Sequence, residues 1–219
     1  MTQLLPNDNA ASASLALLLD KIRKCRICID APQTNRLPHQ PRPVVWGQST
    51  ARILVAGQAP GRRVHTSGIP FNDPSGERLR DWMGVNRGTF YDTRHIAIAP
   101  MGFCFPGQDA KGHDLPPRKE CAAAWRNRLM AQLAHVELVL AIGAYAQHWH
   151  LKQMHHKNLT ETVKAWRTYM SDAFNPPVLP LPHPSWRNNA WLKRNPWFET
   201  EVLVVLRREV HRILGSVRF

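Results

Sequence analysis

Hydrophobic residues in this chain form short continuous runs separated by longer segments of mixed polarity. Four runs stand out, at 51–56 (ARILVA), 95–99 (HIAIA), 137–142 (ELVLAI) and 177–181 (PVLPL). Short apolar runs without polar alternation are typical of strands that are buried on both faces, as in parallel sheets. We therefore expect four strands at these positions.

Segments with apolar residues three or four positions apart predict helices around these strands. The expected helices are 12–24, Ser75–Met83 with Ser75 as its N-cap, 118–135, 144–152, 159–170 and 196–214. Strands that alternate with helices predict a parallel sheet covered on both faces. The predicted fold class is α/β, a three-layer α/β/α arrangement with a central four-stranded parallel sheet.

Ligands bind to such sheets beyond the carboxyl ends of the strands. Four loops follow the strands here, at 57–61, 100–117, Gly143 and 183–185. We expect the fold to bring them to one edge of the sheet, where they would form a site.

The length of 219 residues fits one domain, in which residues 1–45 supply a helix, a cysteine pair and a proline-rich connector. No apolar run is long enough to span a membrane. The first residues lack the basic and apolar regions of a signal peptide. We expect a cytoplasmic protein that does not contact membranes.

The chain carries 29 Lys and Arg against 16 Asp and Glu, a formal net charge of +13. A domain this basic commonly binds a polyanion, because its cations displace the counterions condensed on phosphates. We therefore expect a nucleic acid as the partner.

Four cysteines are present, the closely spaced pair Cys25 and Cys28 and the distant pair Cys104 and Cys121. In a reducing compartment, metal ligation is a better explanation for such a set than disulfides. Four thiolates can hold a [4Fe–4S] cluster or a structural zinc ion. The spacing alone leaves both open.

Several of these segments, taken in order, are familiar. VVWGQSTARILVAGQAPG (44–61), GIPFNDPSGERL (68–79), LVLAIGAYA (138–146) and HPSWRNNAWLKRNPWF (183–198) resemble the uracil-DNA glycosylase superfamily, and the cysteine spacing is similar to that of its iron–sulfur branch. The resemblance implies a DNA glycosylase of base-excision repair, commonly a monomer, that acts on duplex or single-stranded DNA. It also favours a [4Fe–4S] cluster over zinc.

The resemblance assigns roles to individual residues. His183 would donate a hydrogen bond to the departing base and so stabilise its negative charge. Phe71 would stack on the base after it leaves the helix. The remaining base-binding candidates are Gly57, Ala59, Gly61 and Asn72.

A second group of residues would contact the DNA strand. Arg62 and Arg63 are expected to bind phosphates. The segment Ser185, Trp186, Arg187 and Asn188 would press into the duplex at the vacated position, with Trp186 or Arg187 as the wedge.

The chain departs from the family pattern at the residues that would carry out the reaction and read the base. Gln58 stands where the family has a glutamate, Val64 and His65 stand where an acidic pair is expected, and Pro100 replaces a base-reading asparagine. Gln58 and His183 then remain as catalytic candidates, together with Asp73, which could orient a water molecule. His65 could orient water or attack the sugar as a nucleophile.

Three hypotheses follow from these observations. The first is a glycosylase that removes uracil or a related deaminated base, which Phe71 and His183 favour. The second is a non-catalytic DNA-binding homologue with a decayed pocket, which the missing carboxylates favour. The third is a zinc-stabilised α/β domain with a basic surface, against which the ordered motifs argue.

Overall fold

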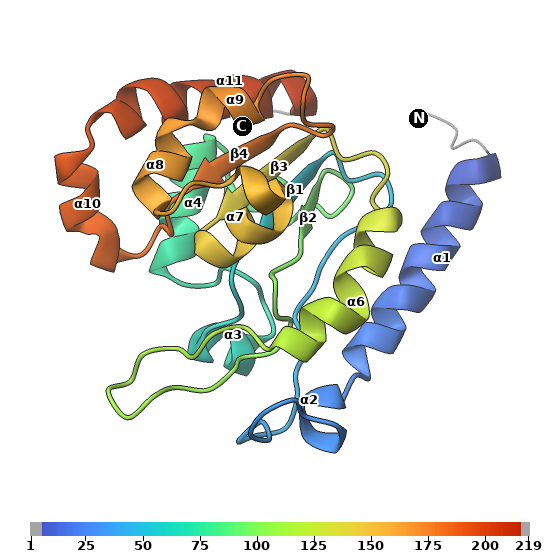
Figure 1. The fold of residues 1–219 in the computed structure, drawn as a ribbon. Coiled ribbons are helices and arrows are strands. Elements are labelled where there is room, and N and C mark those ends of the chain that lie inside the picture. Colours follow the sequence, from blue (N-terminus) through green and yellow to red (C-terminus); the bar gives the residue numbers. More distant parts are fainter. Residues whose placement is uncertain (1–5, 216–219) are drawn as a thin grey trace.

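A four-stranded, all-parallel sheet forms the middle layer of the structure, a computed structural model that describes residues 6–215 (Figure 1). Its strands are β1 (Ile53–Ala56), β2 (Ile96–Ile98), β3 (Leu138–Ile142) and β4 (Val178–Leu181). They lie in the order β2-β1-β3-β4. The four expected strands and the α/β/α class are confirmed.

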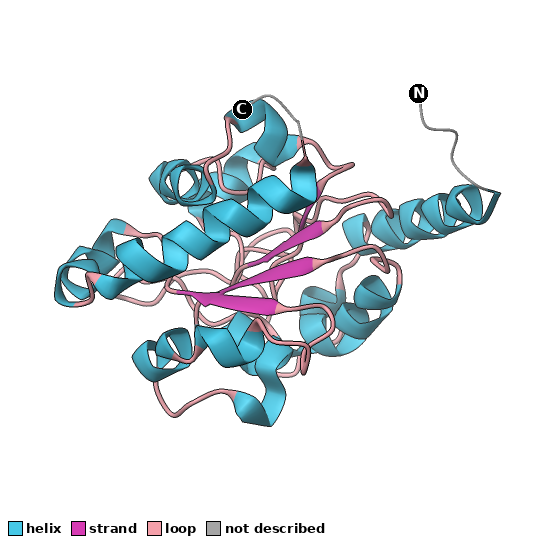
Figure 2. Cartoon of the chain, turned by 90° about the horizontal axis from the view of Figure 1, so that it is seen from above, coloured by secondary structure: helices cyan, strands magenta, loops and turns pink. Residues whose placement is uncertain are grey.

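Successive residues of each strand contribute to two separate cores, one on each face of the sheet (Figure 2). Ile53 and Val55 of β1 pack in the first core, and Leu54 and Ala56 in the second. Since side chains alternate across a strand, an unbroken apolar run satisfies both faces at once. The register of β1 against its neighbours is therefore fixed by burial on either side.

Helices cover the two faces of the sheet as separate layers. The first core is covered by α4 (Pro74–Met83), α8 (Leu159–Lys164) and α11 (Leu203–Leu214), and the second by α1 (Pro6–Arg23), α6 (Lys119–Ala131) and α7 (Ala144–Leu151). No helix within residues 6–215 is long and apolar enough to cross a membrane.

Three helix predictions need correction. The N-cap of α4 is Asp73, whose carboxylate accepts a 2.8 Å hydrogen bond from the Gly76 backbone, so Ser75 lies inside the helix. The expected helix 159–170 is two pieces, α8 and α9 (Trp166–Tyr169), that meet at Ala165. The expected helix 196–214 begins as a π-helical segment, Phe198–Val202, before α11.

Short helices that the sequence pattern did not predict connect the main elements. They are α2 (Ile27–Asp30), α3 (Arg62–Ser67), α5 (Arg87–Tyr91) and α10 (Asn189–Arg194), with 3₁₀ turns at Lys152–Met154 and Trp186–Asn188. Each is too short to show a helical period, and among these six elements only α5 and the turn at Trp186–Asn188 have a side-chain N-cap. Asn86, for example, caps α5 by accepting from the Thr89 backbone at 2.8 Å.

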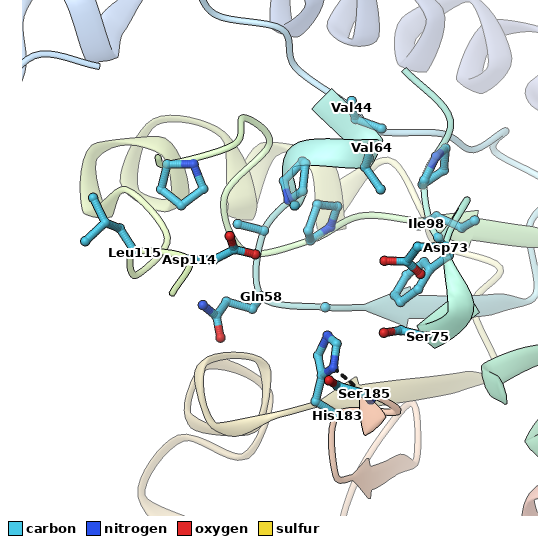
Figure 3. A pocket seen from close by; sticks show the side chains of 18 of the residues that line it. Val44, Gln58, Val64, Asp73, Ser75, Ile98, Asp114, Leu115, His183 and Ser185 are labelled. Atoms are coloured by element: carbon cyan, nitrogen blue, oxygen red, sulfur yellow. Dashed lines mark hydrogen bonds between the residues drawn. The ribbon is translucent and has the colours of Figure 1, made fainter. Parts of the chain in front are cut away.

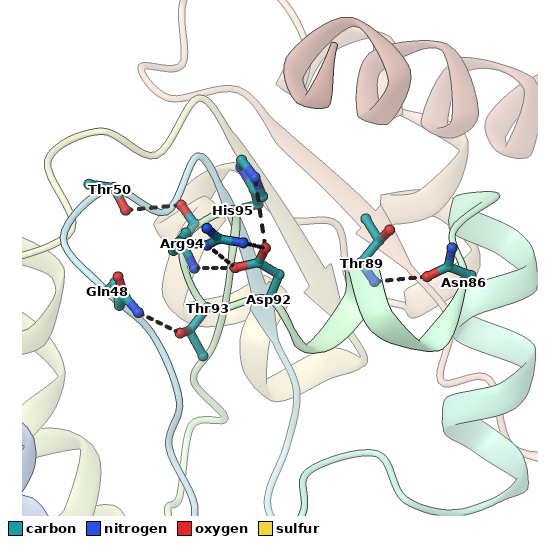
Figure 4. A network of polar contacts seen from close by, with 8 residues as sticks. All are labelled: Gln48, Thr50, Asn86, Thr89, Asp92, Thr93, Arg94 and His95. Carbon is teal, nitrogen blue, oxygen red and sulfur yellow. Dashed lines mark hydrogen bonds and ion pairs between the residues drawn. The ribbon is translucent and has the colours of Figure 1, made fainter. Parts of the chain in front are cut away.

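A polar network ties the segments that enter β1 and β2 to one another at the edge of the sheet opposite to the carboxyl ends (Figure 4). Thr50 donates to the Arg94 backbone carbonyl at 3.0 Å, and Gln48 donates to the Thr93 hydroxyl at 3.0 Å. Asp92 accepts from the Arg94 guanidinium at 2.6 Å. These hydrogen bonds hold the two segments side by side at the point where they enter β1 and β2.

A fully buried cation, Arg126 of α6, holds the opposite end of β2. It donates to the carbonyls of Ala99 and Pro100 at 2.6 and 3.1 Å and contacts Nε2 of His150 on α7 at 2.6 Å. The imidazole can accept this hydrogen bond only when neutral. Burial and the charge of Arg126 both lower the pKa of His150 well below its usual range.

This pair predicts a specific acid sensitivity. Because the pKa of His150 is lower in the folded state than in the unfolded state, unfolding takes up a proton below about pH 6.5. The free energy of unfolding should therefore fall as the pH drops below that value, by at most about 1.4 kcal/mol per pH unit for this group. His150→Gln, which keeps an acceptor for Arg126, should reduce this slope in urea titrations at successive pH values. His156→Gln, at an exposed position, should not, and equal slopes in wild type and His150→Gln would contradict the assignment.

Candidate active site

Loops from the carboxyl ends of β1, β2 and β4 surround one cavity of about 410 Å³ (Figure 3). This volume lies within the range of small-ligand sites. Its lining includes ten of the residues that the sequence analysis selected: Gly57, Gln58, Ala59, Gly61, Phe71, Asp73, His183, Ser185, Arg187 and Asn188. The turn at Gly143 is not part of this lining.

The loop after β1 forms the floor of the cavity. The carbonyls of Gly57 and Gln58 accept hydrogen bonds from the backbones of Met101 and Gly102 at 2.9 and 3.0 Å, so this loop is fastened to the loop after β2. A Cβ atom on Gly57 would lie 3.4 Å from the tip of the Phe71 ring. The Phe71 ring thus lies beside the backbone of the loop at Gly57.

Phe71 adopts a left-handed backbone conformation, with φ of 53°, that is rare for a bulky residue. The surroundings impose it. A Cβ on Gly76 would lie 1.8 Å from the Phe71 carbonyl oxygen, so only glycine allows α4 to start there, and the Tyr91 hydroxyl holds the preceding Pro70 carbonyl at 2.8 Å. The Phe90 ring meets the Phe71 ring edge-to-face at 6.0 Å. Strain of this kind persists where neighbouring structure fixes it, and it concentrates at functional sites.

His183 follows β4 and projects into the cavity (Figure 3). Its Nδ1 accepts a hydrogen bond from the Ser185 backbone at 3.2 Å, so the neutral ring carries its proton on Nε2. Burial lowers the pKa of His183, although the charges of Asp73 and Asp114 oppose this shift. The ring is thus a neutral donor near pH 7, aimed into the cavity.

Two residues outside the expected set position the His183 loop. The buried Gln147 of α7 donates to the Leu181 carbonyl at 3.0 Å, at the last residue of β4. Arg78 of α4 donates to the Ser185 carbonyl at 3.2 Å and to the Asn189 side chain at 2.8 Å. Since α4 begins directly after the loop that carries Phe71, Arg78 links the His183 loop to the side of the cavity that the Phe71 ring forms, the aromatic wall.

Five expected residues lie outside the lining: Arg62 and Trp186, whose chain neighbours line it, and a group of three, His65, Asn72 and Arg63. The His65 ring on α3 packs against His39 and Phe105, at centroid distances of 4.4 and 5.8 Å, and burial lowers its pKa. The Asn72 side chain accepts from Arg87 at 3.1 Å. Arg63 is exposed on α3. None of the three side chains borders the cavity.

Of the expected DNA-contacting residues, Ser185, Arg187 and Asn188 line the cavity, and Trp186 and Arg62 adjoin lining residues in the chain. Trp186 is 70% exposed, although large aromatic side chains are usually more buried than this, and the Arg187 guanidinium lies 5.8 Å from its ring centroid. Arg62 on α3 is also exposed and donates to the Gln108 side chain at 2.7 Å. An exposed aromatic ring beside a cation fits contact with nucleobases and phosphates.

The four cysteines line one small, otherwise apolar cavity between α1, α2 and α6, together with Ile22, Pro41, Pro43, Phe103 and Trp125. Cys121 accepts from the Phe103 backbone at 3.3 Å, and Cys25 accepts from the Trp125 indole at 3.2 Å. Burial raises the pKa of Cys28, Cys104 and Cys121, the last to about 12. No group of three or more histidine, cysteine or acidic side chains in residues 6–215 is arranged to hold a single metal ion.

The cysteine cavity is connected physically to the candidate site. The Val44 backbone donates to the carbonyl of Phe103, next to Cys104, at 2.7 Å, and the nearby side chain of Arg42 donates to the carbonyls of His65 and Thr66 at the end of α3. The segment that carries Arg42 and Val44 therefore contacts both the cysteine region and α3, the helix that directly follows the Gly57–Gly61 loop.

The loop after β2 contributes lining residues that the sequence pattern did not identify. His113, Asp114 and Leu115 line the cavity opposite the aromatic wall. The signal was present as loop length, because residues 100–117 form an unusually long connection and such connections are often functional. The composition of the loop did not indicate which of its polar residues turn inward.

Comparison with known families agrees with this geometry. The family model of the Uracil DNA glycosylase superfamily matches residues 44–207. The match includes all three loops that form the cavity, together with Cys104 and Cys121, while Cys25 and Cys28 precede it. Since the matched segment makes up most of the 219 residues, the chain belongs to the uracil-DNA glycosylase superfamily.

Proposed function

We propose that this protein is a DNA glycosylase that flips a damaged base, uracil or a related deaminated base, and hydrolyses its N-glycosidic bond. The observation that carries the proposal is the pairing of Phe71 and His183 across one cavity at the carboxyl edge of the sheet. A stacking surface and a neutral donor aimed at the same space are what a departing base requires.

Binding begins with extrusion of the nucleotide from the stack, which costs a few kcal/mol. The exposed Trp186 ring would fill the vacated position, and Arg62, Arg63 and Arg187 would hold the strand. The base would then lie against the Phe71 ring, over the glycine loop at Gly57 and Gly61. Face-to-edge packing on Phe90 keeps the Phe71 ring in place.

Bond cleavage leaves the electron pair of the C–N bond on the base. The Nε2–H of His183 would donate to an oxygen of the base and so stabilise the charge as it develops. A neutral imidazole suits this role, since its proton is fixed on Nε2 by the Ser185 backbone. A donor that is positioned before the reaction needs no reorganisation when the charge appears.

Recognition of the base edge is less restrictive than the family pattern implies. Pro100, at the position of the expected asparagine, offers neither an N–H group nor a polar side chain. The pocket therefore lacks the paired donor and acceptor that separate uracil from cytosine at that position. We therefore expect the pocket to accept deaminated bases other than uracil, and hypoxanthine is the second base to assay.

Substitution of His183 tests the enzymatic proposal. His183→Ala should reduce the single-turnover rate of base release by about 10²–10³-fold, because one preorganised donor to the leaving group is lost. DNA affinity should stay within a few-fold of wild type, since strand contacts are separate. The assay uses labelled oligonucleotides with uracil or hypoxanthine, followed by alkaline cleavage at abasic sites, and His156→Ala is the surface control.

A second candidate function is a non-catalytic DNA-binding homologue. The absence of carboxylates at Gln58, Val64 and His65 favours it. Tight binding of the same oligonucleotides without strand breaks for any lesion would support this candidate and reject the glycosylase. Unchanged cleavage by His183→Ala would reject the role of the histidine.

We also propose that Cys25, Cys28, Cys104 and Cys121 hold a [4Fe–4S] cluster. Four thiols around one apolar cavity, with N–H donors directed at two of the sulfurs, fit such a group. Each thiolate of this cluster binds its own iron, so the sulfurs lie farther apart than around a single zinc ion, in keeping with the absence of a compact ion site in residues 6–215. When bound, the cluster would cross-link the N-terminal helices to the loop after β2.

The metal proposal has a direct chemical test. Protein purified without oxygen should be brown, with broad visible absorption and four irons and four sulfides per chain. Cys28→Ser should lose this absorption and unfold at a lower temperature. Because all four cysteines are expected to be ligands, none should react with a thiol reagent until the metal is removed. A colourless protein with one zinc ion would contradict the proposal.

A further inference from the structure

Two carboxylates face the candidate cavity although the loop after β1 carries none. Among the described residues that line it, the acidic side chains are Asp73 and Asp114. They come from different loops, and Figure 3 shows them on opposite sides of the cavity with the His183 ring directed between them. In the hydrolysis of a glycosidic bond, a carboxylate can take the proton from the attacking water.

Asp73 is already engaged in the fold. Its Oδ1 accepts the Gly76 N–H at 2.8 Å and caps α4, the helix whose start keeps Phe71 in its strained conformation. A carboxylate that satisfies a helix N-terminus is held in one orientation and is less available as a base. The sequence alone favoured Asp73 only because it lies next to Phe71.

Asp114 is presented by a hairpin formed by residues 107–115. The Leu115 backbone donates to the Gly107 carbonyl at 3.0 Å, and Gln108 and Asp114 form an antiparallel bridge. Across the tip, Asp109 accepts from the His113 backbone at 2.8 Å. The hairpin is thus internally bonded, and it lies beside α3 in Figure 1.

The two oxygens of Asp114 have different surroundings. Oδ1 accepts from the Gln108 amide at 3.0 Å, and Gln108 in turn accepts from Arg62 of α3 at 2.7 Å. Oδ2 lies 3.3 Å from the place that a Cβ on Gly61 would occupy. The carboxylate therefore sits directly against the glycine loop that forms the floor of the cavity.

We propose that Asp114 is the catalytic carboxylate of this enzyme, supplied by the 107–115 hairpin in place of the acidic residues missing after β1. This inference rests on the proposed glycosylase function. It also gives Arg62 a second role, since its hydrogen bond to Gln108 orients the carboxylate.

The reaction is a hydrolysis with water as the only co-reactant. The C–N bond breaks with its electron pair on the base, which accepts a hydrogen bond from Nε2 of His183. Water attacks C1′ of the resulting sugar cation, a C–O bond forms, and the water proton passes to Asp114. The negative charge of Asp114 also stabilises the cation before attack.

Asp114→Asn tests the assignment because it keeps the shape and the acceptor for Gln108 while removing the charge. The single-turnover rate of base release should fall by about 10²–10⁴-fold, the usual contribution of general base catalysis. Affinity for the same uracil or hypoxanthine oligonucleotide should be unchanged or slightly higher, since one negative charge near the DNA is lost. Melting temperatures should match that of wild type.

Two further variants separate charge, position and fold. Asp109→Asn removes the same charge from the same hairpin but at a residue outside the cavity lining, and it should cleave as wild type does. Asp73→Asn keeps a good N-cap, and its rate should fall by less than about tenfold.

Each result decides between the proposals. If wild type cleaves the oligonucleotide and Asp114→Asn cleaves it equally fast, the role of Asp114 is overturned and the glycosylase function stays intact. A large loss in Asp73→Asn with little in Asp114→Asn would assign the base to Asp73 instead. Wild-type protein that binds but cleaves no lesion would overturn the glycosylase function and this inference with it.

Discussion

The central position of β1 in a parallel sheet is the constraint on which the rest of the structure depends. β1 pairs with β2 on one side and β3 on the other, and its four residues are divided evenly between the two cores. Its backbone groups are paired within the sheet and its side chains are packed on both faces, so the strand has one register. The chain therefore leaves the sheet at Gly57, beside the carboxyl ends of β2 and β3.

The fixed position of β1 and its neighbours also holds the unfavourable backbone conformation of Phe71 in the candidate site. Phe71 can keep a left-handed backbone because Gly76 has no side chain to collide with the Phe71 carbonyl and because Tyr91 fixes the preceding carbonyl. On the other side of the glycine loop, the segment of Arg42 and Val44 joins the end of α3 to the segment that carries Cys104. The cysteine region and the cavity are therefore connected by hydrogen bonds of one short segment.

Charged and polar side chains reach the candidate cavity from several loops. The loops after β1, β2 and β4 each contribute lining residues, and the loop after β2 supplies Asp114. The Asp114 carboxylate lies against the loop after β1, where a Cβ atom on Gly61 would lie 3.3 Å from Oδ2. His183, in contrast, depends on its own neighbours, because the Ser185 backbone sets its tautomer.

The sequence by itself determined the strands and the fold class, while the resemblance to a known family implied that Phe71 and His183 share a site. The reason is that apolar runs of strand length carry their own burial requirement, and parallel connections bring their ends to one edge. It did not distinguish Asp73 from Ser75 as the N-cap of α4, since both residue types cap helices, and it did not show the break of helix 159–170 at Ala165. The inward turn of Asp114 and the packing of His65 against His39 were decided by tertiary structure, because only contacts between distant segments fix where a loop side chain points.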